Sequence, residues 1–217
     1  MAVELYDEHE QSERVRSWIK EYGFSIVMGL VLAFGGIFGF RQWQDHQANQ
    51  RMLAAEYYEV IQRELEDGSL EVAEDQFLAM QDAVSRNPYI GLSALALAAA
   101  YVEEGRLEPA ARNYRDILAE RRLESLWPVA RLRLARVLQA QGDHAEALAQ
   151  IDGTAPAGYQ GAWAELRGDL LLARGELDQA RLAYQEALEH QTGQGMGRRL
   201  IEMKIDATGP GSAENHS

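Results

Sequence analysis

Five histidines are the side chains of this sequence best suited to metal binding or acid–base catalysis. None of them has a second histidine or a carboxylate at the spacing of a metal-binding motif. The chain also lacks cysteine, which excludes thiolate chemistry and disulfides. The histidines are spread over the chain at His9, His46, His144, His190 and His216. They predict neither a metal site nor a cofactor, and we expect a protein that is not an enzyme.

A glycine-rich run, GQGMG at residues 193–197, is the next candidate because glycine-rich loops can hold phosphate. It follows a predicted helix instead of a strand and lacks the Lys-Ser/Thr pair of a phosphate-binding loop, so it is interpreted as a linker. The acidic residues of 56–75 are interpreted as a solvated helix face. A net charge of −13 argues against nucleic acid as a partner, because phosphate binding needs clustered Lys and Arg.

Arg133 and Arg136 are a third candidate, a basic pair that could hold a carboxylate of a partner. The alternative is an ordinary solvated helix face with charges three residues apart. Which interpretation holds depends on the helices that carry the two arginines and on the surface that those helices form.

An uncharged run at residues 22–40 predicts a transmembrane helix. Nineteen helical residues reach about 28 Å, close to the roughly 30 Å of a bilayer's hydrocarbon core. Trp18, Tyr22 and Trp43 flank the run, where aromatic rings favour the membrane interface. A buried core helix seldom runs so long with so much glycine, and a cleaved signal peptide would be shorter and end in small residues.

Basic residues near the two ends of the run predict its orientation. Three precede it and two follow it, a bias that favours an N-terminus inside the cytoplasm. They are Arg14, Arg16 and Lys20 before the run, and Arg41 and Arg51 after it. Residues 1–21 are therefore expected to be cytoplasmic, and the chain from residue 41 onward to lie outside the cytoplasm.

Small residues recur along the predicted transmembrane helix and could form a smooth face for packing on another membrane helix. The alternative, mere tolerance of glycine in lipid, is equally compatible with the sequence. The candidate packing face consists of Gly29, Ala33, Gly35, Gly36 and Gly39.

A repeat organises the rest of the chain, which shows no sustained alternation typical of strands and is predicted to be all-α. Four glycines, spaced by 37, 37 and 33 residues, are each followed five residues later by alanine and nine residues later by a large apolar residue. Glycine can end a helix with a positive backbone angle, and alanine allows two helices to approach closely. The three series are Gly68, Gly105, Gly142 and Gly175; Ala73, Ala110, Ala147 and Ala180; and Phe77, Tyr114, Ile151 and Tyr184.

This pattern resembles the tetratricopeptide repeat, in which antiparallel helix pairs stack into an α-solenoid. Prolines agree with the frame, since Pro88 and Pro128 fall where the first helix of a pair should begin and Pro109 falls in the first turn of a second helix. Residues 198–207 are predicted to form a capping helix with Leu200, Ile201 and Ile205 on one face. The end, residues 207–217, has the composition of a disordered tail.

The first helix of each pair is expected to line the concave side of the stack, where partners would bind. On the repeat frame we expect this groove to contain Tyr58, Gln62, Leu95, Ala99, Val102, Arg133, Arg136, Glu165, Asp169 and Leu172. Use of the groove as a whole is the prediction; for any single position, a solvated helix face is the better interpretation.

Taken together, the chain is similar to the YfgM family of bacterial inner-membrane proteins, ancillary subunits of the SecYEG translocon. The resemblance is carried by the acidic head YDEHEQSERVRSWIKEYG, the glycine-rich membrane run, FRQWQDHQ directly after it, and the repeats. It implies a single-span protein with its N-terminus in the cytoplasm and a tetratricopeptide-like domain, residues 41–206, in the periplasm. No catalytic residues are implied.

The resemblance further implies partners: SecYEG, a membrane-anchored periplasmic chaperone of the PpiD type, and polypeptides leaving the channel. It also implies a link to restraint of an envelope stress response. The alternative is a general membrane-anchored scaffold for outer-membrane or cell-wall assembly, which would have the same anchor and repeats. Co-purification with translocon subunits distinguishes the two.

Overall fold

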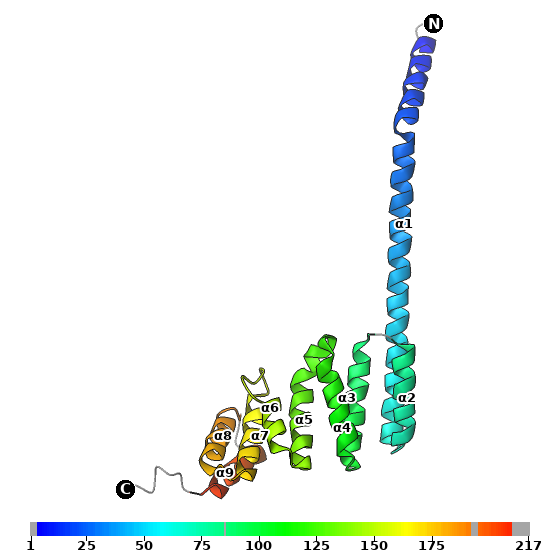
Figure 1. Cartoon of the computed structure of the whole chain (residues 1–217). Helices are drawn as coiled ribbons and strands as arrows, with labels where there is room; N and C mark the ends of the chain where they lie inside the picture. The colour runs from blue at the N-terminus through cyan, green and yellow to red at the C-terminus, as the bar shows by residue number, and fades with distance from the viewer. Residues whose placement is uncertain (1–3, 85, 192–194, 210–217) are drawn as a thin grey trace. The chain divides into compact units, whose positions relative to one another are not determined.

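The computed structural model describes residues 4–84, 86–191 and 195–209, and these are helical with short connections and no strand. Two compact units divide the chain, Met1–Met52 and Leu53–Ser217. The helices are labelled in Figure 1. They are α1 Glu4–Glu66, α2 Leu70–Ala83, α3 Pro88–Glu103, α4 Leu107–Ala119, the 3-10 helix η1 Arg121–Leu126, α5 Trp127–Gln141, α6 His144–Gln150, α7 Gln160–Ala173, α8 Leu177–Glu189 and α9 Met196–Ala207.

Helix α1 provides the whole described part of the first unit and continues without a break to Glu66. It contains the one helix segment of the described chain that is long and apolar enough to cross a membrane, by length and composition. Its apolar side chains face outward, with Phe24 75% and Leu32 69% exposed. A structure in water would not leave such a surface open, whereas lipid would cover it.

Aromatic pairs stand at both ends of this apolar run. The rings of Trp18 and Tyr22 lie 5.9 Å apart at one end, and those of Phe40 and Trp43 lie 6.0 Å apart at the other. Amphipathic rings at two levels about one membrane thickness apart are typical of a transmembrane helix. All-α architecture with an N-terminal membrane helix is thus confirmed.

The second unit is built of helix pairs, each closed by one of the predicted glycines. Gly68, Gly105, Gly142 and Gly175 have φ angles of 74°, 72°, 87° and 78°, the left-handed region that glycine adopts without strain. All four end a helix in the same way. At the first, the N–H of Gly68 donates to the carbonyl of Leu65 and the N–H of Ser69 to that of Glu64, a Schellman motif.

Alanine and large apolar residues then close each pair, as the repeat predicted. Ala73, Ala110, Ala147 and Ala180 are all 0% exposed. The large residues one turn further on, Phe77, Tyr114, Ile151 and Tyr184, are likewise buried. The last part of α1 contributes Ala54 and Ile61 to the same core as α2, so the first pair consists of the end of α1 and α2.

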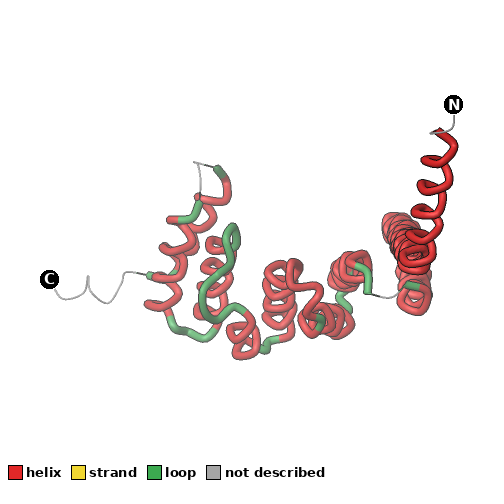
Figure 2. Tube along the Cα trace, turned by 90° about the horizontal axis from the view of Figure 1, so that it is seen from above, coloured by secondary structure: helices red, strands yellow, loops and turns green. Residues whose placement is uncertain are grey.

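Successive pairs stack in chain order: α2 packs on α3, α4 on α5, α6 on α7 and α8 on α9. Figure 1 labels the helices of the second unit along this row, and Figure 2 shows the same row turned by 90°. The predicted tetratricopeptide-like α-solenoid is confirmed. The prolines also stand as predicted, because α3 begins at Pro88 and α5 has a proline in its first turn.

Three features depart from the sequence analysis. Helix α6 is short, at seven residues, and a connection without regular structure follows it, which the repeat did not predict. The 3-10 helix η1 between α4 and α5 was not foreseen. In α9, Ile201 is buried and Ile205 packs on the core, but Leu200 is 45% exposed, so its prediction on the same face was wrong. One residue of offset turns a side chain by about 100° around a helix, enough to leave the buried face.

The end of the described chain is ordered slightly beyond the predicted boundary. Helix α9 extends to Ala207, and the buried Thr208 donates its hydroxyl to the carbonyl of Ile205 at 2.6 Å. Residues 210–217 of the predicted tail, residues 193–194 of the predicted linker, and residue 192 before it lie outside the described residues.

Candidate partner-binding groove

A hollow of about 270 Å³ opens between α3 and α5. It brings together four of the predicted groove positions, Ala99 and Val102 from α3 with Arg133 and Arg136 from α5. The remaining lining residues are Glu103, Leu107, Tyr114, Val137 and Ala140. The floor is apolar and the edge carries two guanidinium groups, a combination that suits an apolar side chain next to a carboxylate.

Tyr114 links this hollow to the core. The ring is 1% exposed and belongs to α4, and burial raises the pKa of its hydroxyl, while the neighbouring Arg133 partly opposes that shift. Arg133 and Arg136 are both exposed, and within the described part of the chain neither forms an ion pair. Their positive charges are therefore available to a partner.

The predicted groove residues of the first helix pair, Tyr58 and Gln62, interact with other residues of this chain. The Gln62 side-chain amide donates to the Tyr58 hydroxyl at 2.8 Å, and the Tyr58 ring lies 5.5 Å from that of Tyr89. Leu95, placed in the groove by the repeat frame, is 8% exposed and part of the hydrophobic core. Its prediction as a surface contact was wrong, because its side of α3 is covered by neighbouring helices.

The predicted groove residues of α7 hold helix α9. Lys204 donates to Glu165 at 2.7 Å and to Asp169 at 2.9 Å, and the Tyr184 hydroxyl donates to Asp169 at 2.8 Å. Leu172 is half-buried against the same small core. This end of the predicted groove is therefore covered by the chain's own α9.

Electrostatics reinforce that contact. Burial alone would lower the pKa of Lys204, but its bonds to Asp169 and Glu165 outweigh burial and raise it. Burial, together with the bond to Asp169, raises the pKa of Tyr184. Both groups thus keep their protons over the physiological range, and the cluster stays intact there.

This cluster was not predicted from the sequence, although the sequence contains a signal for it. Lys204 lies three residues after Ile201 and one before Ile205, so it stands on the edge of the helix face that α9 buries. A single lysine at such a position needs a carboxylate on the facing helix. Over the ranges 4–84, 86–191 and 195–209, no three His, Asp or Glu side chains gather so as to hold a metal ion.

An apolar anchor helix followed by stacked helix pairs with an open hollow between α3 and α5 defines a class of protein, the membrane-anchored tetratricopeptide-like scaffold. A family model described as "Tetratricopeptide repeat-like domain" matches residues 16–210. A crystal structure of BtubC (BKLC) from P. vanneervenii is similar in fold, with a TM-score of 0.55 at 16% identity over 77% of this chain and 76% of that one. This likeness concerns the fold alone.

Curated relatives define the family more closely. The chain is 31% identical over 208 residues to the "Ancillary SecYEG translocon subunit" of Escherichia coli (strain K12), covering 94% of this chain and 98% of that protein. It is 27% identical to the protein of the same name from Haemophilus influenzae, covering 92% and 97%. The chain belongs to this family of tetratricopeptide repeat-like proteins, the YfgM family.

Proposed function

We propose that this protein is a non-enzymatic ancillary subunit of the SecYEG translocon that holds partner proteins at the bacterial inner membrane. The observation that carries the proposal is similarity over nearly the whole chain to relatives with that name, anchor included. A likeness confined to the repeats would support only a scaffold, since such repeats occur in many of them.

Within this function, the hollow between α3 and α5 is the proposed contact for periplasmic partners. A chaperone of the PpiD type, and polypeptides emerging from the translocon, are the proposed occupants. The exposed Arg133 and Arg136 would attract acidic segments to an apolar floor, which favours binding of unfolded or extended chains of mixed composition. Modulation of an envelope stress response would follow indirectly from this client traffic.

The anchor is proposed to make a separate contribution. The proposed contact is the set of small residues Gly29, Ala33, Gly35, Gly36 and Gly39; an added Cβ at any of these glycines would meet nothing within 4 Å, which agrees with a helix surface left open for a partner. Small residues of this kind allow close approach of another membrane helix. Two contacts on one chain raise the effective concentration of the second once the first has formed.

The proposed orientation places the N-terminus in the cytoplasm and the repeat unit in the periplasm, with one membrane crossing. A reporter enzyme fused after residue 217 tests it. A reporter that works only in the periplasm should be active there, and activity only of a cytoplasmic reporter would contradict the orientation.

Affinity purification of the full-length chain in mild detergent tests the function. We expect subunits of SecYEG and a periplasmic chaperone to be enriched. A photo-crosslinking residue at Val102, in the hollow, should capture the periplasmic partner, whereas one at Leu182, exposed on α8, should not. Enrichment of outer-membrane or cell-wall assembly proteins without translocon subunits would favour the general envelope scaffold instead.

A further inference from the structure

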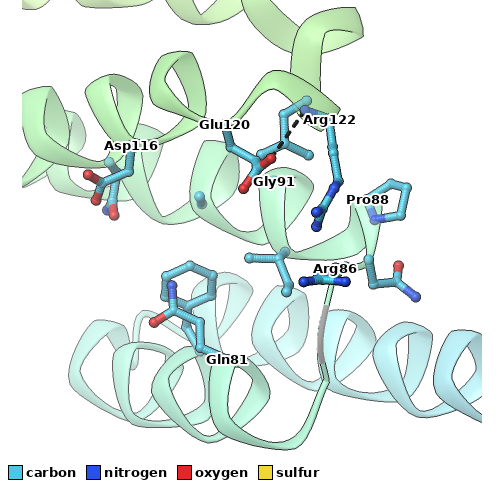
Figure 3. A pocket seen from close by; sticks show the side chains of 13 residues that line it. Gln81, Arg86, Pro88, Gly91, Asp116, Glu120 and Arg122 are labelled. Atoms are coloured by element: carbon cyan, nitrogen blue, oxygen red, sulfur yellow. Dashed lines mark hydrogen bonds between the residues drawn. The ribbon is translucent and has the colours of Figure 1, made fainter.

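A second pocket, of about 250 Å³, lies between α2, α3, α4 and η1 and shares no residue with the groove. Figure 3 shows it from close by. Its floor is apolar and its rim is polar. Phe77, Ile90, Gly91, Ala94 and Leu123 form the floor, and Gln81, Arg86, Asn87, Pro88, Asn113, Asp116, Glu120 and Arg122 form the rim.

The walls of this pocket are firmly built. A Cβ at Gly91 would come within 3 Å of Leu123 and Leu126, so glycine is what allows η1 to lie against α3. The indole N–H of Trp127 donates to the carbonyl of Ile117 at 3.2 Å and ties the start of α5 to the end of α4. On the opposite wall, the Asn87 side chain caps α3 by accepting from the N–H of Tyr89 at 3.1 Å.

Two guanidinium groups converge at one end of the rim. Figure 3 shows Arg86 and Arg122 pointing toward one another across the mouth, with Asp116 on the other side of the pocket. Neither arginine forms an ion pair within the described chain, whereas arginines elsewhere in the repeats do, such as Arg115 with Glu146 and Arg167 with Glu186.

Like charges aimed at one point repel, and an anion placed between them would turn repulsion into charge-assisted hydrogen bonds. The nearby Glu120 does not fill this role in the structure. One of its carboxylate oxygens accepts from the backbone N–H of Arg122 at 3.3 Å and caps η1.

We propose that this pocket is a second peptide-binding site, which takes one large apolar side chain of a partner polypeptide together with an acidic residue directly beside it. The volume lies below the roughly 300 to 1,000 Å³ of a typical small-molecule site, so it suits a single anchor side chain of a longer chain. Arg86 and Arg122 hold the carboxylate, and the side-chain amides of Gln81 and Asn113, which lie on the rim, meet the peptide backbone. Asp116 disfavours a second acidic residue on the far side of the anchor.

Fluorescence anisotropy with full-length protein in nanodiscs tests this site. The probe is a labelled peptide, Gly-Ser-Glu-Phe-Gly-Ser, compared with Gly-Ser-Lys-Phe-Gly-Ser and Gly-Ser-Glu-Ala-Gly-Ser. Binding of the first is expected, and the loss of the anchor or the reversal of the charge should each weaken it at least about fivefold at low salt.

Rim variants locate the binding. Arg86→Gly and Arg122→Ala should each lower the affinity for the labelled peptide about fivefold, since each removes one charged contact at a partly solvated rim. Glycine suits position 86 because its φ is 61°, so this variant is not expected to strain the fold. Arg121→Ala, an exposed neighbour outside the pocket, changes the charge equally and should leave affinity unchanged.

Three results would overturn the proposal: equal binding of the lysine peptide, equal binding by the double variant Arg86→Gly/Arg122→Ala, or an affinity for sodium octanoate above that for the peptide. The last would assign the pocket to a small amphipathic acid. Because no translocon component takes part, the outcome is independent of whether the protein associates with SecYEG.

Discussion

Gly168 is the position where the structure predicts the sharpest response to the smallest change. It lies in α7 against the ring of Tyr184 from α8, and a Cβ added there would fall within 3 Å of three ring atoms. The ring cannot easily move aside, because it is 0% exposed and its hydroxyl donates to Asp169 at 2.8 Å. Gly168→Ala therefore forces two packed helices apart.

Two opposing effects set the magnitude. Alanine in a helix interior is favoured over glycine by about 1 kcal/mol, and overpacking a closed core costs roughly 1 to 3 kcal/mol. With the ring fixed at both ends, we take the upper part of that range. The net expectation is that Gly168→Ala lowers the free energy of unfolding by about 1 to 2 kcal/mol.

Urea unfolding of the full-length chain, with hydrogen exchange to locate the effect, is the assay. The loss of protection should concentrate in α7, α8 and α9, because repeat units depend chiefly on their neighbours. Gly197→Ala is the matched control: its added Cβ would meet Gln191 at an ordinary 3.7 Å, so stability should stay equal or rise. If Gly168→Ala proves as stable as the unchanged protein, the close packing described for this pair is wrong.

Three further predictions concern pH, the groove and the anchor. Burial and a hydrogen bond to Glu74 raise the pKa of Tyr101 to about 12 from the 10.0 of an unfolded chain. The protonated tyrosine therefore contributes stability that is fully present below pH 10 and is lost as the pH rises toward 12. The urea midpoint should fall over this pH window, and should fall less in Tyr101→Phe. Reversing charge with Arg133→Glu and Arg136→Glu should weaken capture of periplasmic partners severalfold without altering the circular dichroism spectrum, and unchanged capture would place the partner surface elsewhere. Gly35→Leu should reduce co-purification of membrane partners in mild detergent, and equal recovery would mean that glycine there is merely tolerated in lipid.

The repeat frame was predictable because its determinants are local. A glycine with a positive φ, an alanine five residues on and a large residue four further are each read from a short stretch, and all four sets lie where predicted. The membrane helix was predictable for the same reason, since length and the absence of charge decide it.

The groove was predictable only in part. Ala99, Val102, Arg133 and Arg136 do line one hollow, but Leu95 is buried and Asp169 is bound by Lys204. Those outcomes depend on which helix covers which face, and the spacing of the repeat does not specify this. The pocket of Arg86 and Arg122 depends on the 3-10 helix η1. A helix this short has no periodic sequence pattern from which it could be predicted.

The four Schellman turns have a consequence for how this protein folds. Each closes a helix pair with hydrogen bonds between residues three or five apart, and from α2 onward helices that pack together are neighbours or next neighbours along the chain. Local contacts make for fast folding. A pair can therefore form as soon as its own residues are free, on the surface provided by the pair before it. A chain that crosses a membrane from its anchored end would fold as it emerges. The apolar face of each new helix would stay exposed only until the next turn glycine and the helix after it had emerged.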